Sequence, residues 1–342
     1  MMNLAEYRST ATRLADYLPW AALVGSGVVL NKDGSFQRTA KFRGPDLDSA
    51  VAAELVAVAG RINNAVRRLG SGWSIFVEAQ RSEAATYPDS RFPDAASALV
   101  DAERKAGFEE ADAHFVSGYF LTFLWLPPAE EAARTEAWLY EGREKTGVDP
   151  WELMRGFIDR TDRVLALLDG FMPECRWMDD GATLTYLHST ISTNRHRVRV
   201  PEVPMHLDAL LADQPLTGGL EPRLGDTHLR VLTIVGFPTA TMPGLLDEMN
   251  RLPFPYRWGT RAILLDKTDA TRLLTRIRRQ WFAKRKSIAA ILKEVMTNEA
   301  SALVDTDAAN KALDADMALQ ELGADVAGMA YVTATVTVWD AD

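Results

Sequence analysis

The 342-residue sequence predicts an α+β fold, built from two successive modules that each mix helices and strands. Segments with the two-residue hydrophobic period of strands alternate along the chain with longer segments of helical period. The same alternation recurs after a Pro- and Gly-containing stretch at 171–181. We therefore expect an N-terminal amphipathic segment at 1–25, followed by two mixed α/β sandwich modules at 26–175 and 176–342, ferredoxin-like or of a related sandwich type.

The composition is that of a folded globular protein. Hydrophobic residues make up 47% of the chain and charged residues 25%, which excludes the disordered and collagen-like classes. The formal net charge of −9 opposes extensive wrapping of nucleic acid, because phosphate binding needs concentrated positive charge. Cys175 is the only cysteine, so neither an intramolecular disulfide nor a zinc-thiolate cluster is expected. This cysteine usage and the shortness of the apolar runs predict a cytoplasmic protein.

An amphipathic helix is expected at the N-terminus. Its apolar positions recur every three or four residues and stop before Pro19. The apolar face either packs on its own domain or docks on a membrane protein or the lipid surface. A loose likeness to a signal peptide is opposed by the acidic residues and the proline of this segment. The candidate interaction residues on this face are Leu4, Tyr7, Leu14, Tyr17 and Leu18.

The first module is expected to open with a β-hairpin. Asp33-Gly34 supplies the positive φ angles of a tight turn between strands at Val28–Asn31 and Phe36–Phe42. Periodicity and Gly and Pro punctuation give the remaining elements of this half. They are helices at 47–69, 95–113 and 151–168 and strands at 73–79 and 119–126.

The second module is expected to repeat the alternation after a connecting excursion at 195–225, which is rich in Pro, Gly and small polar residues. Its boundary with the first module is placed near Cys175. The expected helices lie at 182–189, 243–251, 268–296 and 307–322, and the expected strands at 229–235, 256–265 and 327–338.

No arrangement of catalytic residues emerges from the sequence. A phosphate-binding loop needs a Gly-Lys pair, and the chain contains none. Ile263-Leu264-Leu265-Asp266 has the apolar-then-acidic pattern of a magnesium-holding strand, but without that loop we interpret it as an ordinary strand end. Gly25-Ser26-Gly27 is interpreted as a turn rather than part of a dinucleotide loop. We expect no cofactor in this segment and no ATP hydrolysis by it alone.

Metal binding and acid–base chemistry are also not expected. The five histidines lack the helical spacing of zinc ligands. The adjacent acids Asp179-Asp180 and Asp247-Glu248 are more typical of helix ends or solvated faces than of a catalytic pair. Cys175 has no neighbouring base that would activate its thiol.

The strongest charge feature is the helix expected at 268–296. Its apolar residues form one stripe while the opposite side is basic, and no acidic residue lies between Arg272 and Lys293. The basic side is either a solvated face neutralised by the acidic stretch 299–325, a docking site for anionic lipid or an acidic partner, or a contact for DNA. The candidate residues are Arg272, Arg276, Arg279, Lys284, Arg285 and Lys286.

Several separated blocks of sequence resemble the amino-terminal region of TrbE-type conjugal transfer ATPases, in the CagE/TrbE/VirB family of type IV secretion. The blocks occur in order along nearly the whole chain. They include Asn31-Lys32-Asp33-Gly34-Ser35-Phe36, Phe42-Arg43-Gly44-Pro45-Asp46, Leu184-Thr185-Tyr186-Leu187-His188-Ser189-Thr190, Gln280-Trp281-Phe282-Ala283-Lys284-Arg285-Lys286 and Tyr331-Val332-Thr333-Ala334-Thr335-Val336.

The resemblance implies an ATPase that powers pilus assembly and substrate transfer at the cytoplasmic face of the inner membrane. In that family a RecA-like motor, which uses ATP and Mg²⁺, follows this region. The motor's phosphate loop is missing here, so no catalytic residue is carried over. What remains implied is a non-catalytic docking and assembly region that contacts inner-membrane and other secretion subunits and self-associates. The alternative is a nucleic-acid-handling module that uses the basic helix.

Overall fold

The structure is a computed structural model that describes residues 13–46, 50–84, 86–110, 114–128, 149–237, 241–284 and 306–341. The chain divides into two compact units, each made of separate stretches of sequence. Unit 1 comprises 1–55, 75–261 and 333–342, and unit 2 comprises 56–74 and 262–332. Each unit thus combines stretches from both of the modules expected at 26–175 and 176–342, and Cys175, the expected boundary, lies inside unit 1.

The strands of the described residues form one eleven-stranded sheet in the order β1-β2-β3-β5-β4-β10-β11-β9-β8-β7, with β6 paired to β3. All eleven contribute residues to unit 1, while the ends of β4, β10 and β11 at 73–74, 262–265 and 329–332 belong to unit 2. The strands are β1 (Trp20–Gly25), β2 (Val28–Asn31), β3 (Phe36–Arg43), β4 (Trp73–Glu83), β5 (Phe115–Trp125), β6 (Glu174–Trp177), β7 (Leu216–Thr217), β8 (Arg223–Leu224), β9 (Thr227–Thr233), β10 (Tyr256–Leu265) and β11 (Met329–Asp340).

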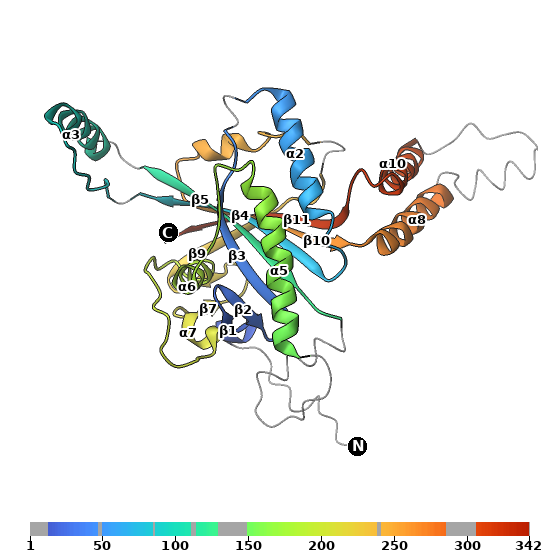
Figure 1. The fold of residues 1–342 in the computed structure, drawn as a ribbon, viewed down its shortest axis with the longest axis horizontal. Helices are drawn as coiled ribbons and strands as arrows, with labels where there is room; N and C mark the ends of the chain where they lie inside the picture. Colours follow the sequence, from blue (N-terminus) through green and yellow to red (C-terminus); the bar gives the residue numbers. More distant parts are fainter. Residues whose placement is uncertain are drawn as a thin grey trace, which may run out of the picture. The chain divides into compact units, whose positions relative to one another are not determined.

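Helices flank these strands in sequence, so the expected α+β class is confirmed. Figure 1 shows α5 lying across the strands, and α3 at the end of the β4 and β5 ribbon. The described helices are α1 (Leu14–Tyr17), α2 (Ala52–Val66), α3 (Ala95–Glu110), α5 (Pro150–Asp169), α6 (Asp180–Ser189), α7 (Leu207–Leu211), α8 (Lys267–Lys284), α10 (Thr306–Gly323) and the 3-10 helix η2 (Asp247–Arg251).

The hairpin expected around Asp33-Gly34 is confirmed as β2 and β3. Gly34 has φ +80 and donates its N–H to the Asn31 carbonyl at 3.0 Å, and Asp33 Oδ1 accepts from the Ser35 N–H at 3.0 Å. The strand β1, which was not expected, precedes the hairpin and pairs antiparallel with β2. It was hidden in the continuous apolar run 18–30, in which Gly27, at φ +64, provides the turn.

Strand β3 is paired along both edges. Its residues Phe36–Phe42 pair with β5 on one edge. On the other edge β2 pairs with the first part of β3, and β6 pairs with Ala40–Arg43. The stretch 171–181, expected to be a joint between modules, therefore adds a strand to the first sheet. A four-residue strand has too few alternating positions to be distinguished from a loop by its pattern alone.

Helix α5 covers part of this sheet. Asp149 caps its N-terminus by accepting the Trp151 N–H at 3.1 Å, and Pro150 occupies the first turn, where its missing N–H costs nothing. The buried residues recur at three- and four-residue steps along one face. Phe157, fully buried in the middle of that face, stacks on Phe36 with ring centroids 5.8 Å apart. Burial of this face anchors α5 on β3.

A second core cluster joins the chain start to α6 and α7. Its members come from α1, β1, β2, α6 and α7 and are almost completely buried. They are Leu18, Trp20, Val29, Leu184, Tyr186, Leu187, Leu207 and Leu211. Part of the stretch 195–225, expected as a long connecting excursion, therefore forms the short helix α7 and packs on β1.

In unit 2, a turn at 67–72 ties together the segments before α8 and after α10. Asn63 Nδ2 donates to the Val326 carbonyl at 2.8 Å, and the Arg67 guanidinium donates to the Asp325 carbonyl. Asp325, with φ +56, occupies the left-handed region after α10. Lys267 Nζ lies 2.8 Å from its carboxylate. These bonds fix the point from which α8 starts.

Candidate functional site

The basic helix expected at 268–296 is present as α8 over its described part, Lys267–Lys284. Asp266, at the end of β10, starts the helix, because its Oδ1 accepts the Asp269 N–H at 2.7 Å. Ser71 Oγ donates to Asp269 Oδ2 at 2.8 Å and accepts the Asp266 N–H at 3.1 Å. The acid that ends the Ile263–Asp266 run is thus used as a helix cap, in keeping with an ordinary strand end.

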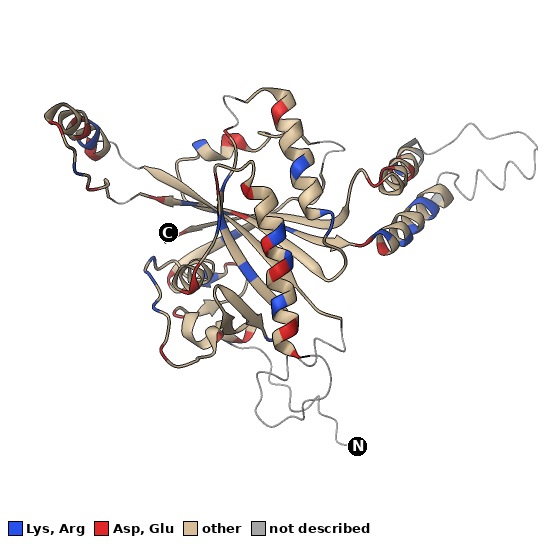
Figure 2. Ribbon diagram, in the orientation of Figure 1, with Lys and Arg blue, Asp and Glu red and all other residues tan. Residues whose placement is uncertain are grey.

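One side of α8 packs on α10, and the two helices run side by side (Figure 1). Arg278 Nη1 lies 2.8 Å from Asp316 Oδ1 of α10. Lys311 Nζ lies 4.5 Å from the centroid of the Trp281 ring, within cation–π range. Figure 2 shows the contrast between basic residues along α8 and acidic residues on α10. The acidic stretch after α8 therefore neutralises the side of the helix that carries Arg278.

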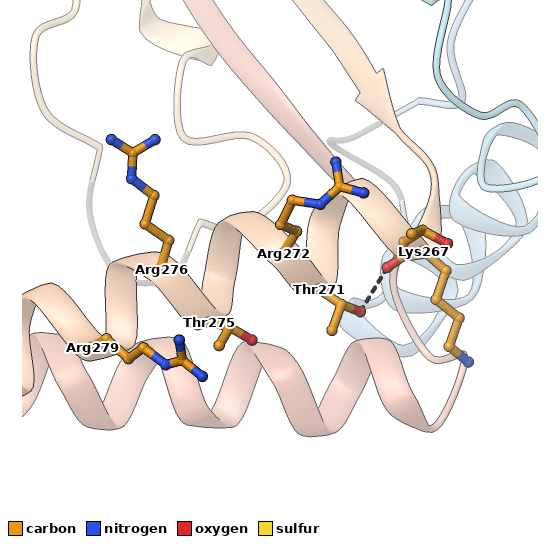
Figure 3. A pocket seen from close by; sticks show the side chains of 7 residues that line it. Lys267, Thr271, Arg272, Thr275, Arg276 and Arg279 are labelled. Carbon is orange, nitrogen blue, oxygen red and sulfur yellow. Dashed lines mark hydrogen bonds between the residues drawn. The ribbon is translucent and has the colours of Figure 1, made fainter.

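Another side of α8 borders an open groove of about 730 Å³. Figure 3 shows Arg272 and Arg276 projecting from α8 away from the neighbouring helix. Arg272 is paired with Asp269 at 3.0 Å within the same helix. Arg276 and Arg279 are exposed, and no carboxylate of the described residues lies within 4.0 Å of either guanidinium. The lining residues are Lys267, Thr268, Thr271, Arg272, Thr275, Arg276 and Arg279.

We call Arg272, Arg276 and Arg279 the basic face of α8. The sequence named all three, and the structure brings them together on one groove. Lys284 is the last residue of α8. Arg285 and Lys286, which were also named, lie outside the described residues, as do Leu4 and Tyr7 of the first helix.

The described end of the first helix contributes to a core. Leu18 is 6% exposed and belongs to the cluster that contains Trp20, and Leu14 packs against that cluster. Tyr17 is 65% exposed. Both leucines are thus used to hold α1 on unit 1, which leaves Tyr17 on the outer surface.

Sequence patterns gave no sign of a buried polar network in unit 1 centred on Glu78. The Glu78 side chain is 6% exposed and accepts from both Nε and Nη2 of Arg257, at 2.6 and 2.5 Å. Tyr186 Oη donates to the same carboxylate at 3.1 Å, and Gln80 Nε2 at 2.6 Å. Burial alone would lower the pKa of Arg257, yet the carboxylate of Glu78 raises it. Burial and then Glu78 raise the pKa of Tyr186.

A second polar cluster closes the chain around the end of α6. His188, 2% exposed, lies with its Nε2 3.0 Å from Asp213 Oδ2. Asn194 Nδ2 donates to the same carboxylate oxygen at 2.9 Å, and Ser192 Oγ at 3.1 Å. Burial would raise the pKa of Asp213, but these hydrogen bonds outweigh it and lower the pKa. The ionised carboxylate thus holds 192–194 against α6.

This cluster predicts a pH dependence of stability. Because the pKa of Asp213 is lower in the folded chain, its contribution is present above the unfolded value of about 3.9 and is lost as the pH falls through the folded value. We expect Asp213→Asn to unfold at a lower urea concentration near neutral pH and to depend less on pH below about 4 than the parent. Urea midpoints measured across this range test it, and parallel pH profiles would contradict it.

The remaining sequence motifs have structural roles. Asp179 caps α6 by accepting the Ala182 N–H at 2.7 Å, and Asp180 accepts the Gly27 N–H at 2.6 Å. Cys175 is buried, and burial followed by the charge of Asp169 raises the pKa of its thiol to about 11. Within the described ranges, no cluster of three potential metal ligands occurs. No helix in those ranges has the length and apolarity needed to span a bilayer.

Comparison with known proteins gives consistent matches. Residues 27–133 match the family described as type IV secretion system ATPase VirB4/TrbE, N-terminal domain. A conjugal transfer protein TrbE from Rhizobium radiobacter is 30% identical over 361 aligned positions, which cover 100% of this chain and 43% of the relative. The chain therefore spans less than half the length of that relative.

Two relatives come from Sinorhizobium fredii (strain NBRC 101917 / NGR234), in which a probable conjugal transfer protein TrbE is split into two polypeptides. The first polypeptide is 41% identical over 140 residues, covering 40% of this chain and 93% of the relative. The second polypeptide is 28% identical over 159 residues, covering 46% of this chain and 23% of the relative.

Proposed function

Since this chain contains a VirB4/TrbE-type N-terminal domain, we propose that it is the non-catalytic docking and assembly region of a type IV secretion ATPase that powers pilus assembly and substrate transfer in conjugation. The parent protein would bind ATP and Mg²⁺ in a motor domain beyond this region. In the proposal, this region joins the motor to inner-membrane and other secretion subunits on the cytoplasmic side of the membrane, and supports self-association of the parent.

The observation that supports docking most directly is the basic face of α8. One side of the helix is occupied by α10, so α8 is held in place without using Arg272, Arg276 and Arg279. Arginine side chains on a fixed helix form a rigid cationic strip that suits an anionic surface. Such a strip is expected to bind the negatively charged cytoplasmic side of the inner-membrane complex.

A charge-removal variant tests this role. We expect Arg272→Gln, Arg276→Gln and Arg279→Gln together to weaken binding to inner-membrane vesicles from cells that carry the conjugation system by about 100-fold, at about 1 kcal/mol per cation. The measurement is co-sedimentation at increasing salt. The matched control removes three exposed arginines elsewhere, Arg104, Arg163 and Arg199. Equal losses in both variants would reduce the effect to net charge and contradict docking by this face.

The alternative is nucleic-acid handling by the same face. Single-stranded DNA bound through phosphates loses affinity steeply with salt, with a log–log slope of roughly −0.7 per phosphate neutralised. If the α8 variant loses DNA binding on this slope while its vesicle binding equals that of the control, the nucleic-acid role replaces docking.

The absence of catalysis is tested separately, by ATP turnover of this chain beside a version extended through the following domain. Only the extended protein is expected to hydrolyse ATP. Turnover by the 342-residue chain itself would contradict a non-catalytic role.

A further inference from the structure

A cavity in unit 1 lies against α6 and the chain that follows it. Its volume is about 770 Å³, within the range of small-molecule sites. Phe120, Met178 and Val198 give it an apolar wall, and the buried side chains of Gln80 and Tyr186 also line it. The cavity therefore combines an apolar side with fixed polar groups, as ligand pockets do.

The charged residues of this cavity are mostly cationic. Lys41 from β3 and Arg195 and Arg197 from the chain after α6 all line it. In the described part of the chain, no carboxylate lies within 4.0 Å of these three side-chain cations. Asp179 is the one acid in the lining, and its Oδ1 is used to cap α6 at Ala182. The cavity thus gathers cations that lack an internal counter-charge.

Arg195 is held in an unfavourable position. The nearby Glu78 carboxylate is bound by both Nε and Nη2 of Arg257, and Arg195 Nη1 reaches only Gln80 Oε1, at 3.5 Å. Partial burial of the guanidinium lowers the pKa of Arg195, and the positive charge of Arg257 lowers it further. An arginine stays protonated at neutral pH even so. An anion beside it would relieve both the desolvation and the repulsion.

We propose that this cavity binds the phosphate group of a small ligand, with Arg195, Arg197 and Lys41 contacting the phosphate oxygens. Arginine suits phosphate because its planar group donates two parallel hydrogen bonds. Lysine adds a point charge, and the wall formed by Phe120, Met178 and Val198 covers the apolar part of the ligand. This site lies on residues distinct from the basic face of α8, so it stands independently of the proposed function.

The test is calorimetric titration of the chain with pyrophosphate, ADP and magnesium-free buffer alone. We expect saturable binding of a phosphate ligand that weakens about tenfold or more in Arg195→Gln, since a charge-assisted hydrogen bond to the ligand is lost. Lys41→Gln, whose side chain lies outside the Glu78 network, should weaken binding in the same direction. Arg272→Gln on α8 is the control and should bind like the parent.

The source of the phosphate is separated by a second arm, sedimentation with phosphatidylcholine vesicles with and without phosphatidic acid. Binding of pyrophosphate or ADP with Arg195-dependent affinity supports a soluble phosphorylated ligand. Arg195-dependent binding to phosphatidic acid vesicles alone supports a lipid headgroup at the same cavity. The proposal is overturned if neither source binds, or if Arg195→Gln and Lys41→Gln, folded by circular dichroism, bind as tightly as the parent.

Discussion

Replacement of Glu78 by glutamine is expected to lower the free energy of unfolding by about 3–5 kcal/mol, because it leaves the largely buried guanidinium of Arg257 without its carboxylate. Two further donors, Tyr186 Oη and Gln80 Nε2, also lose a charged acceptor. Urea unfolding followed by tryptophan fluorescence measures the change. Circular dichroism before denaturation establishes that the variant starts from a folded state.

A double-mutant cycle separates the ion pair from general loss of packing. If the pair is coupled as the geometry indicates, Glu78→Gln combined with Arg257→Gln should cost at least about 1 kcal/mol less than the sum of the two single changes. Strict additivity would mean that the two side chains stabilise the fold independently. That result would contradict a stabilising role for their bidentate contact.

Alanine at Gly27 is expected to be nearly as damaging. Gly27 has φ +64, where a side chain costs about 1–2 kcal/mol, and an added Cβ would lie 2.2 Å from the Met178 carbonyl oxygen. That oxygen belongs to the backbone, so it cannot rotate away, and overpacking adds about 1–3 kcal/mol. We expect Gly27→Ala to lower the free energy of unfolding by about 2–5 kcal/mol, measured as a shift of the urea midpoint.

Gly44 provides the matched control for this change. It has no positive φ, and nothing lies within 4 Å of an added Cβ. Gly44→Ala should therefore change stability by less than about 0.5 kcal/mol. A Gly27 variant as stable as the Gly44 variant would show that the contact between the β1–β2 turn and Met178 is unimportant.

Local patterns predicted most elements of this chain because local chemistry determines them. Asp33-Gly34 could form little other than a tight turn, and the apolar face of α5 recurs at helical spacing around Phe157. The patterns failed where pairing is distant. β6 binds β3 across more than a hundred residues, and no local feature of Glu174–Trp177 indicates that partner. The division into units depends on the same distant pairings.

The two candidate sites differ in the same way. The basic face of α8 lies on one helix, so residue spacing alone placed Arg272, Arg276 and Arg279 on it. The phosphate cavity was missed, because Lys41, Gln80 and Arg195 come from separate elements and meet only in the folded chain. The isolated histidines gave a weak signal: His188 and His196 have ring centroids 4.4 Å apart and both line the cavity.

The interleaving of the two units has a consequence for synthesis on the ribosome. Residues 56–74 emerge early, but the rest of unit 2, at 262–332, emerges only after most of unit 1 has been made. Until then the apolar residues of α2 have none of their unit 2 partners, and such exposed segments are where aggregation and chaperone binding concentrate. Nascent chains arrested before 262 should therefore be protease-sensitive at 56–74, and those arrested beyond 332 should be protected there.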